Sequence, residues 1–255
     1  MIKFAVCIKA VRTNLVYENE YRSESYVINP YDLYALKELT SLKKKYDIEI
    51  TCICMGSLKA EEVLKRAFAL GSDKGILISD SKFGGADTVA TVSVLSKVLE
   101  KEEYDYIICG KKTVDGETGQ VPYGLAEKLG YRCIDNALHI DDIADNNLMM
   151  KVKKDEKIYT AKSLGKSVVI MSEYALKDNE VSLMALKKAR KKEVNIVKFH
   201  DLEIEENHCG IKGSKTYVVE AKNTIVPKKE SEKVTGEIKN KAEFLLKLLS
   251  SRGNN

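Results

Sequence analysis

Apolar runs of strand length alternate with helical periodicity along the first half of the chain. The runs predict strands over residues 2–8, 48–55, 75–79 and 104–109. Between and after these runs, apolar residues recur every three or four positions, which predicts helices over 30–46, from Ser57 to Gly71, 87–100 and 120–129. Such alternation is typical of a parallel sheet with right-handed crossovers and helices on both faces. The expected fold class is therefore α/β.

Several residues next to these runs are typical of helix ends. Asn29 is a natural N-cap in front of Pro30, which fits the first helical position. Ser57 is expected to cap the second helix, which Gly71 ends, and Gly130 ends the helix over 120–129.

The second half of the chain has another pattern and another charge. Residues 151–200 hold 13 basic and 6 acidic side chains. We predict a last buried strand over 166–171, a hairpin of 148–153 with 157–161, and a short strand over 216–221. An amphipathic helix over 238–249 closes the chain, and its apolar stripe needs its own core or another subunit to lie on. We therefore expect a nucleotide-binding domain over 1–200 and a partner-wrapping C-terminal arm over 201–255.

Composition narrows the class of protein. With 44% hydrophobic residues among 255, uniform disorder is excluded, and a net charge of +4 is too mild to indicate nucleic acid. No apolar run reaches the roughly 18 residues that a membrane span needs. The first seven residues lead directly into a predicted strand without a basic leader. We expect a soluble, cytoplasmic protein without a membrane span.

The cysteines and histidines do not predict a metal site. The six cysteines form no CxxC, and the three histidines have no ligand spacing. Cys52 and Cys54 lie in a predicted strand, and we expect their side chains on opposite faces, where they would not share a metal. We expect Cys209 in a solvated loop.

The segment 109–121 is the strongest candidate for chemistry. It joins a strand to a helix through Gly110, Gly116 and Gly119, which permit close backbone approach. Backbone amides and a helix N-terminus favour an anion, normally a phosphate. The segment is neither a Walker loop nor GxGxxG, so an ordinary strand–helix loop stays an open alternative. Asp115 and Glu117 suit capping or a ribose hydroxyl better than direct phosphate contact.

Other strand ends converge on the same edge of the predicted sheet. They are the end of the first strand at 7–9, the start of the first helix at 29–32, the end of the second strand at 54–56, and a second glycine turn at 84–88. Asn29 and Asp32 have a simpler explanation as helix caps only. Two glycine turns at helix starts nevertheless suggest a mononucleotide or dinucleotide. GxSxG and HExxH are absent, so any reaction is carried by the cofactor.

The residues resemble the beta subunit of electron-transferring flavoproteins over nearly the whole chain. The matching stretches are 6–9, 28–32, 54–56, 67–73, 85–88, 90–91, 109–111, 115–121 and the basic run 188–192. The resemblance implies a Rossmann-like, adenine nucleotide alpha-hydrolase-like fold with a C-terminal extension arm. It also implies a heterodimer with an alpha subunit that carries electrons through FAD from an acyl-CoA-type or other dehydrogenase to an acceptor.

The resemblance also implies a cofactor in this subunit and the residues that hold it. In the family the beta subunit holds either a structural AMP or, in the electron-bifurcating branch, a second FAD that accepts hydride from NADH. We expect FAD, with AMP as the alternative, and Leu183 as the residue that docks on the dehydrogenase. The cofactor-binding positions expected are Cys7, Asn29, Pro30, Tyr31, Asp32, Cys54, Gly85, Asp87, Thr88, Thr113, Val114, Asp115, Gly116, Glu117, Thr118, Gly119, Gln120 and Val121.

Two hypotheses from other classes stay open at this point. The run 187–192 holds five positive residues in six, which would suit nucleic-acid phosphates, yet it has no interleaved aromatic residue. We expect no nucleic-acid partner. A stand-alone ATP-binding domain of the same sheet class is the second alternative, against which the long C-terminal arm argues.

Overall fold

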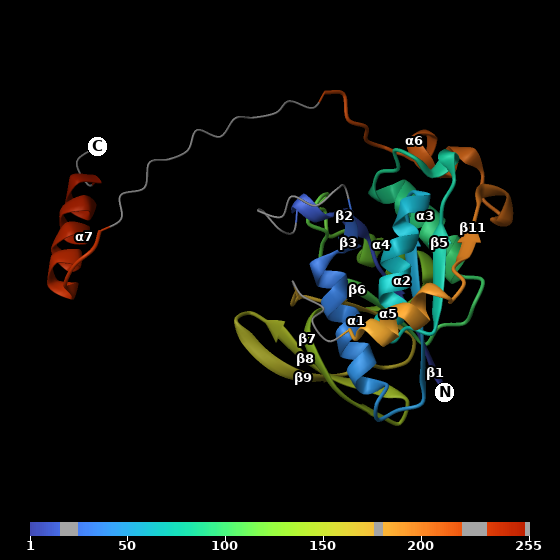
Figure 1. The fold of residues 1–255 in the computed structure, drawn as a ribbon, viewed down its shortest axis with the longest axis horizontal. Helices are drawn as coiled ribbons and strands as arrows, with labels where there is room; N and C mark the ends of the chain where they lie inside the picture. The colour runs from blue at the N-terminus through green and yellow to red at the C-terminus, as the bar shows by residue number, and fades with distance from the viewer. Residues whose placement is uncertain (16–24, 176–180, 221–233, 253–255) are drawn as a thin grey trace. The chain divides into compact units, whose positions relative to one another are not determined.

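The computed structural model describes residues 1–15, 25–175, 181–220 and 234–252 (Figure 1). The chain divides into two compact units, Met1–Tyr217 and Val218–Asn255. The first unit contains the sheet and the candidate site. Across the described residues, no helix combines the length and apolar character that a membrane crossing requires.

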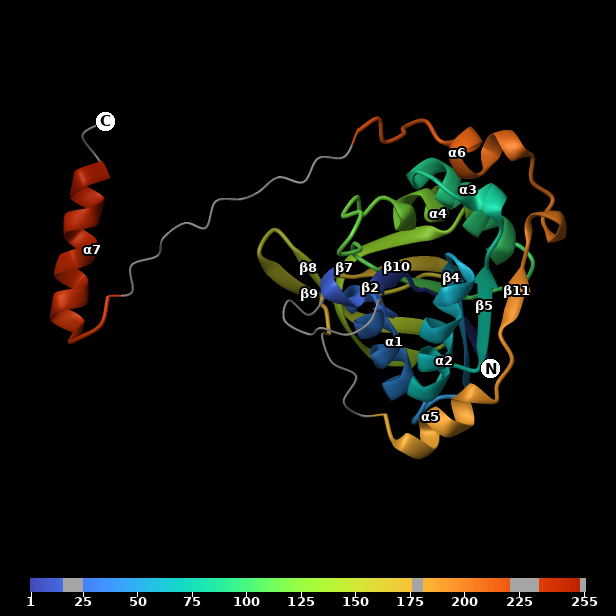
Figure 2. The same cartoon turned by 45° about the horizontal axis from the view of Figure 1, so that its top comes forward.

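A nine-stranded sheet forms the centre of the first unit (Figures 1 and 2). Its order is β11 (Asn195–Val197), β5 (Lys74–Ile78), β4 (Ile48–Met55), β1 (Ile2–Cys7), β6 (Tyr106–Gly110), β10 (Ser167–Met171), β7 (Arg132–Ala144), β8 (Asn147–Lys154) and β9 (Lys157–Lys162). The strands from β11 to β7 are parallel, and β7, β8 and β9 pair antiparallel. A separate antiparallel ribbon joins β2 (Ala10–Arg12) to β3 (Tyr26–Ile28).

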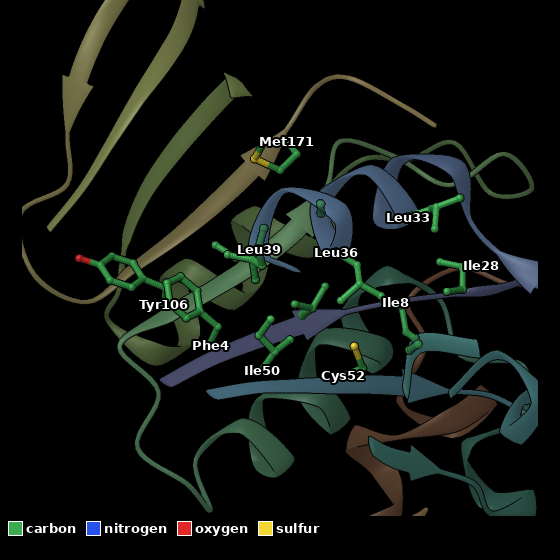
Figure 3. Close-up of a cluster of buried hydrophobic side chains, with 14 of the residues drawn as sticks. Phe4, Ile8, Ile28, Leu33, Leu36, Leu39, Ile50, Cys52, Tyr106 and Met171 are labelled. Atoms are coloured by element: carbon green, nitrogen blue, oxygen red, sulfur yellow. The ribbon is translucent and has the colours of Figure 1, made fainter. Parts of the chain in front are cut away.

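Helices cover both faces of the sheet. Alternate residues of β1 point to opposite faces, so that Phe4 and Val6 lie in one hydrophobic cluster and Ala5 in the other. The first cluster includes side chains of α1 (Pro30–Leu42) and α2 (Glu61–Leu70), and Figure 3 shows Leu33, Leu36 and Leu39 of α1 in it. The second cluster includes side chains of α3 (Thr88–Leu99) and α4 (Val121–Leu129). The predicted α/β fold with a mainly parallel sheet and helices on both faces is confirmed.

The remaining helices are short or peripheral. In the first unit they are α5 (Leu183–Arg190), which packs against α2, α6 (Gly210–Gly213) and the 3-10 turns η1 (Thr13–Leu15), η2 (Leu58–Ala60), η3 (Ser81–Phe83), η4 (Phe199–Asp201) and η5 (Glu206–His208). In the second unit α7 (Ile238–Arg252) confirms the predicted terminal helix and exposes Leu245, Leu246, Leu248 and Leu249.

Several details of the predictions were wrong. The strand over 216–221 does not form in its described part, 216–220, and α1 ends at Leu42 rather than at residue 46. Ser57 makes no side-chain cap, because the turn η2 precedes α2. Cys52 and Cys54 lie in the same cluster, since residues two apart on a strand share a face. Cys209 is buried in the second cluster rather than solvated.

Candidate functional site

The site lies at the topological switch point of the sheet. The chain runs from β1 through α1 to β4 and β5 on one side, and then places β6 on the other side of β1. Open α/β sheets bind ligands outside the carboxyl ends of the strands at such a point. Cys7 and Cys109 are register partners near the ends of β1 and β6, and Cys54 lies near the end of the adjacent β4. The sheet thus brings together the strand ends that the sequence predicted to converge.

Asp32 joins the two strand ends across the switch point. Its carboxylate is buried in the first turn of α1 and accepts hydrogen bonds from the backbone amide of Lys9 at 2.9 Å and from that of Gly110 at 3.2 Å. Burial raises the pKa of Asp32 to about 7, and hydrogen bonds from Lys9, Asn29 and Gly110 only partly offset that effect. The carboxylate fixes the exits of β1 and β6 relative to each other.

Gly110 permits this close approach of β6 and α1. A Cβ at this position would lie 2.4 Å from the Asp32 Oδ1 and 2.6 Å from the Tyr31 Cβ. It would also lie 2.8 Å from the Tyr31 carbonyl carbon, which belongs to the backbone and has little freedom to move away. The glycine is therefore required by contact with α1.

Asn29 braces the loop that follows β6. Its buried amide donates from Nδ2 to the Lys112 carbonyl at 2.9 Å and accepts at Oδ1 from the Val114 amide at 3.1 Å. Asn29 occupies the N-cap position of α1, but its side chain makes no capping hydrogen bond there. The interpretation of Asn29 and Asp32 as helix caps only is therefore wrong, because both side chains bind the strand ends and the loop after β6.

Contacts with Lys9 and within the loop after β6 define the path of this loop. The Lys9 Nζ lies 2.7 Å from the Asp115 Oδ2, and the Glu117 amide donates to the Thr113 carbonyl at 3.0 Å. Burial alone would raise the pKa of Asp115, but the hydrogen bonds from Lys9 and Thr113 together with the charge of Lys9 lower it. Glu117 and Gly119 have positive φ angles of 53° and 63°, so the chain turns sharply before α4.

The end of the loop can hold an anion. In the described part of the chain, no acceptor is present for the amides of Thr118, Gly119 and Gln120. These amides come directly before α4, whose N-terminus carries a partial positive charge. Three amides without acceptors at a helix N-terminus suit a phosphate, so the residues fit a nucleotide.

Most polar groups of the second glycine turn, 84–88, bind other residues of the chain. Gly85 lies against Ile211 with a φ of +70°, and both carboxylate oxygens of Asp87 accept hydrogen bonds within the chain. Thr88 alone reaches the loop, with its hydroxyl 3.4 Å from that of Thr118. The turn is adjacent to the loop, but most of its polar groups are already bonded.

Sequence reasoning missed a cavity beside the loop. It has a volume of about 360 Å³ and is lined by Ala10, Arg12, Asn14, Tyr26 and Asp115. The strands β2 and β3 that form one wall have only three residues each, too few for a periodic signal.

Leu183 lies apart from this site. It is 84% exposed at the start of α5, where the Ser182 hydroxyl caps the helix by accepting from the Ala185 amide at 3.1 Å. Among the described residues, no group of three His, Cys, Asp or Glu side chains is arranged to hold a metal ion.

The fold defines a doubly wound α/β protein in which the loop after β6, beside the switch point, leads into the N-terminus of α4. Residues 21–202 match the model of the electron transfer flavoprotein domain family. The chain is 36% identical over 231 residues to the electron transfer flavoprotein subunit beta of Thermoanaerobacterium thermosaccharolyticum, covering 89% of this chain and 86% of that protein.

Two further relatives have other names. Protein FixA of Azorhizobium caulinodans is 30% identical over 217 residues, covering 82% of this chain and 76% of the relative. The acryloyl-CoA reductase electron transfer subunit gamma of Anaerotignum propionicum is 29% identical over 199 residues, covering 75% and 74%. The chain belongs to the electron transfer flavoprotein family, and the resemblance to beta subunits is confirmed.

Proposed function

We propose that this chain is the beta subunit of a cytoplasmic electron transfer flavoprotein and binds an adenine nucleotide at the switch point. The observation that carries the proposal is the loop after β6, which Asn29 and Asp32 brace and which ends in three amides for which the described residues offer no acceptor. Family membership supports electron transfer as the function that this site serves.

We assign the phosphates to residues 113–121 and the adenosine to the neighbouring strand ends. The amides of Thr118, Gly119 and Gln120 would hold the phosphate at the start of α4. Cys7 and residues 29–32 would line the adenosine part, with Asn29 and Asp32 acting through the backbone that they brace. Cys54, whose side chain is fully buried, would contribute only its backbone.

The cofactor that we propose is FAD, with AMP as the alternative. FAD, when bound, accepts electrons and passes them on, and in a bifurcating complex it would accept them from NADH. A second phosphate needs further donors, and Thr88 is the residue of the glycine turn that faces the loop. Gly85 and Asp87 already contact residues 211–216. We therefore propose that Thr88 is the residue of this turn that binds the second phosphate.

We propose two protein partners. An alpha subunit completes the heterodimer, and the arm with α7 wraps it, because the helix exposes Leu245, Leu246 and Leu249. A dehydrogenase docks on α5, where Leu183 and Met184 are both more than four-fifths exposed. A relative named for acryloyl-CoA reductase favours an acyl-CoA-type dehydrogenase.

The two alternatives from other classes have less support. Lys192 of the basic run donates to the Ser72 carbonyl at 3.0 Å and packs over the Phe68 ring, so it is used inside the protein. Family membership argues against a stand-alone ATP-binding domain, because the relatives are named as electron transfer subunits.

Co-expression with an electron transfer flavoprotein alpha subunit tests the proposal. We expect a yellow heterodimer, and the extracted FAD and AMP are counted per complex. Two FAD with bleaching by NADH supports the bifurcating form, whereas one FAD and one AMP without NADH reactivity supports the structural-AMP form. A wild-type chain that binds neither nucleotide, alone or in the complex, would contradict the assignment.

A matched pair of loop variants tests the location of the nucleotide. Gly119→Val forces a side chain onto a positive φ, where a Cβ lies 3.0 Å from the Lys111 carbonyl, and should abolish nucleotide retention. Gly130→Val, at the other end of α4, has the same kind of φ and nothing within 4 Å, so it controls for backbone strain. Equal nucleotide content in the two variants would refute the location.

A further inference from the structure

The segment 199–216 lies over the turn 80–88 at the edge of the sheet. The Lys82 ammonium is paired with Glu206 and lies 4.0 Å from the centre of the Phe199 ring. Gly210 has a φ of +56°, and a Cβ there would lie 2.0 Å from the Lys82 carbonyl oxygen. Glycine is thus required at this position, and the segment is seated closely on the turn.

Asp87 holds the end of this segment with both of its carboxylate oxygens. Oδ1 caps α3 by accepting from the Ala90 amide at 3.0 Å. Oδ2 accepts from the amides of Lys215 at 2.7 Å and Thr216 at 3.0 Å, and from the Thr216 hydroxyl at 3.2 Å. The Asp87 amide in turn donates to the Ser214 hydroxyl at 2.8 Å. One side chain therefore organises residues more than 125 positions later in the chain.

These bonds lie directly before the second unit, Val218–Asn255, and we call residues 214–216 the root of the arm. The first compact unit ends at Tyr217, the residue after Thr216, and everything beyond belongs to the second unit. Asp87, which holds Lys215 and Thr216 through its side chain and Ser214 through its amide, therefore fixes the point from which the arm starts.

We propose that Asp87 is a positioning residue that holds the root of the C-terminal arm for binding to the partner subunit, and that it does not contact the nucleotide. The proposal rests on the proposed function, because the partner is the alpha subunit assigned above. The hydrogen bonds from Ala90, Thr216 and Lys215 outweigh the effect of burial and lower the pKa of Asp87, so the carboxylate is ionised and accepts all four bonds at neutral pH.

The variant Asp87→Ser separates capping from anchoring. Serine is as good an N-cap as aspartate, so α3 keeps its cap, but its single oxygen does not also reach Lys215 and Thr216. The matched control is Asp80→Ser. Asp80 caps η3 through the Lys82 amide and holds Phe199, at the opposite end of the segment 199–216 from the arm root, through the Phe199 amide at 3.2 Å.

Hydrogen exchange and assembly are measured on the full chain and on the heterodimer. In Asp87→Ser we expect the amides of Lys215 and Thr216 to exchange about tenfold faster or more, because charge-assisted hydrogen bonds are lost. The heterodimer should dissociate at roughly tenfold higher concentration, with the same FAD and AMP count per complex. Thr216→Val removes only the hydroxyl bond and should shift both quantities less.

Three results would overturn the proposal. Loss of nucleotide with unchanged heterodimer affinity would place Asp87 in the nucleotide site. Unchanged exchange at Lys215 and Thr216, or equal weakening of the heterodimer by Asp80→Ser, would remove its role as the anchor. A wild-type chain that forms no heterodimer would contradict the proposed function instead, and the exchange rates would then decide whether Asp87 holds the root.

Discussion

Replacing Gly110 with alanine tests the packing on which the site depends. The new Cβ would lie within 3 Å of the Asp32 carboxylate and of two atoms of Tyr31, one of them in the backbone. The strand β6 and the first turn of α1 must therefore separate. Gly110 does not have a positive φ, so the variant adds steric overlap without backbone strain.

The expected cost has two parts. Overpacking a well-packed site costs about 1–3 kcal/mol. Separation also stretches the 3.2 Å hydrogen bond from the Gly110 amide to Asp32, and hydrogen bonds to charged groups contribute about 1.5–3 kcal/mol. Because the two effects share the same atoms, they do not add fully. We expect the free energy of unfolding to fall by about 3–5 kcal/mol.

Urea unfolding of the full chain measures this effect. The midpoint should fall by more than about 1 M at an unchanged slope. The control is Gly116→Ala in the same loop, where the nearest atoms to a new Cβ are at 3.6 Å and 3.9 Å, so stability should change by less than about 0.5 kcal/mol. If the free energy of unfolding of Gly110→Ala also lies within about 0.5 kcal/mol of the wild-type value, then α1 moves aside freely and the packing of the site is not rigid.

Three further predictions concern polar side chains. Asn29→Ala removes both hydrogen bonds to the loop after β6. Nucleotide affinity should therefore fall about tenfold, and the free energy of unfolding should fall by about 1–3 kcal/mol. If calorimetry gives an unchanged nucleotide affinity, Asn29 does not hold the loop for binding. The pKa of Asp32 is raised in the folded chain, so the folded chain binds this proton more tightly than the unfolded chain does. The free energy of unfolding should therefore fall as pH rises from about 4 through 7. Urea unfolding at a series of pH values should show this fall in the wild type but not in Asp32→Asn. The Lys192 ammonium binds the carbonyls of Ser72 and Asp73, so Lys192→Met should raise the rate of amide hydrogen exchange in α5. Lys191→Met is the control. Equal exchange rates in the two variants would contradict a role of Lys192 in holding α5 in place.

The layered fold was predictable because its signals are local. The strand β4 is buried at all but two of its eight positions and is apolar except at Glu49 and Thr51, and α1 carries a leucine stripe at helical spacing. The strand β7 was missed for the opposite reason. Of its 13 residues only Ala137 and Ile140 are buried, and pairing with β10 and β8 rather than its own pattern makes it a strand.

The polar framework of the site was harder to predict because its partners are distant in sequence. Asn29 and Asp87 occupy N-cap positions and Asp32 lies in the first turn of a helix, where short polar side chains are common for local reasons alone. Asp32 binds Lys9, 23 residues away, and the other partners of the three side chains across the site and the arm root lie 78 to 129 residues away. A helix start holds a short side chain at the edge of the sheet, beside the loops that leave neighbouring strands. A residue selected there for capping can therefore also bind a loop, and only the tertiary structure distinguishes Asp87, which caps and anchors, from Asn29, which braces without capping.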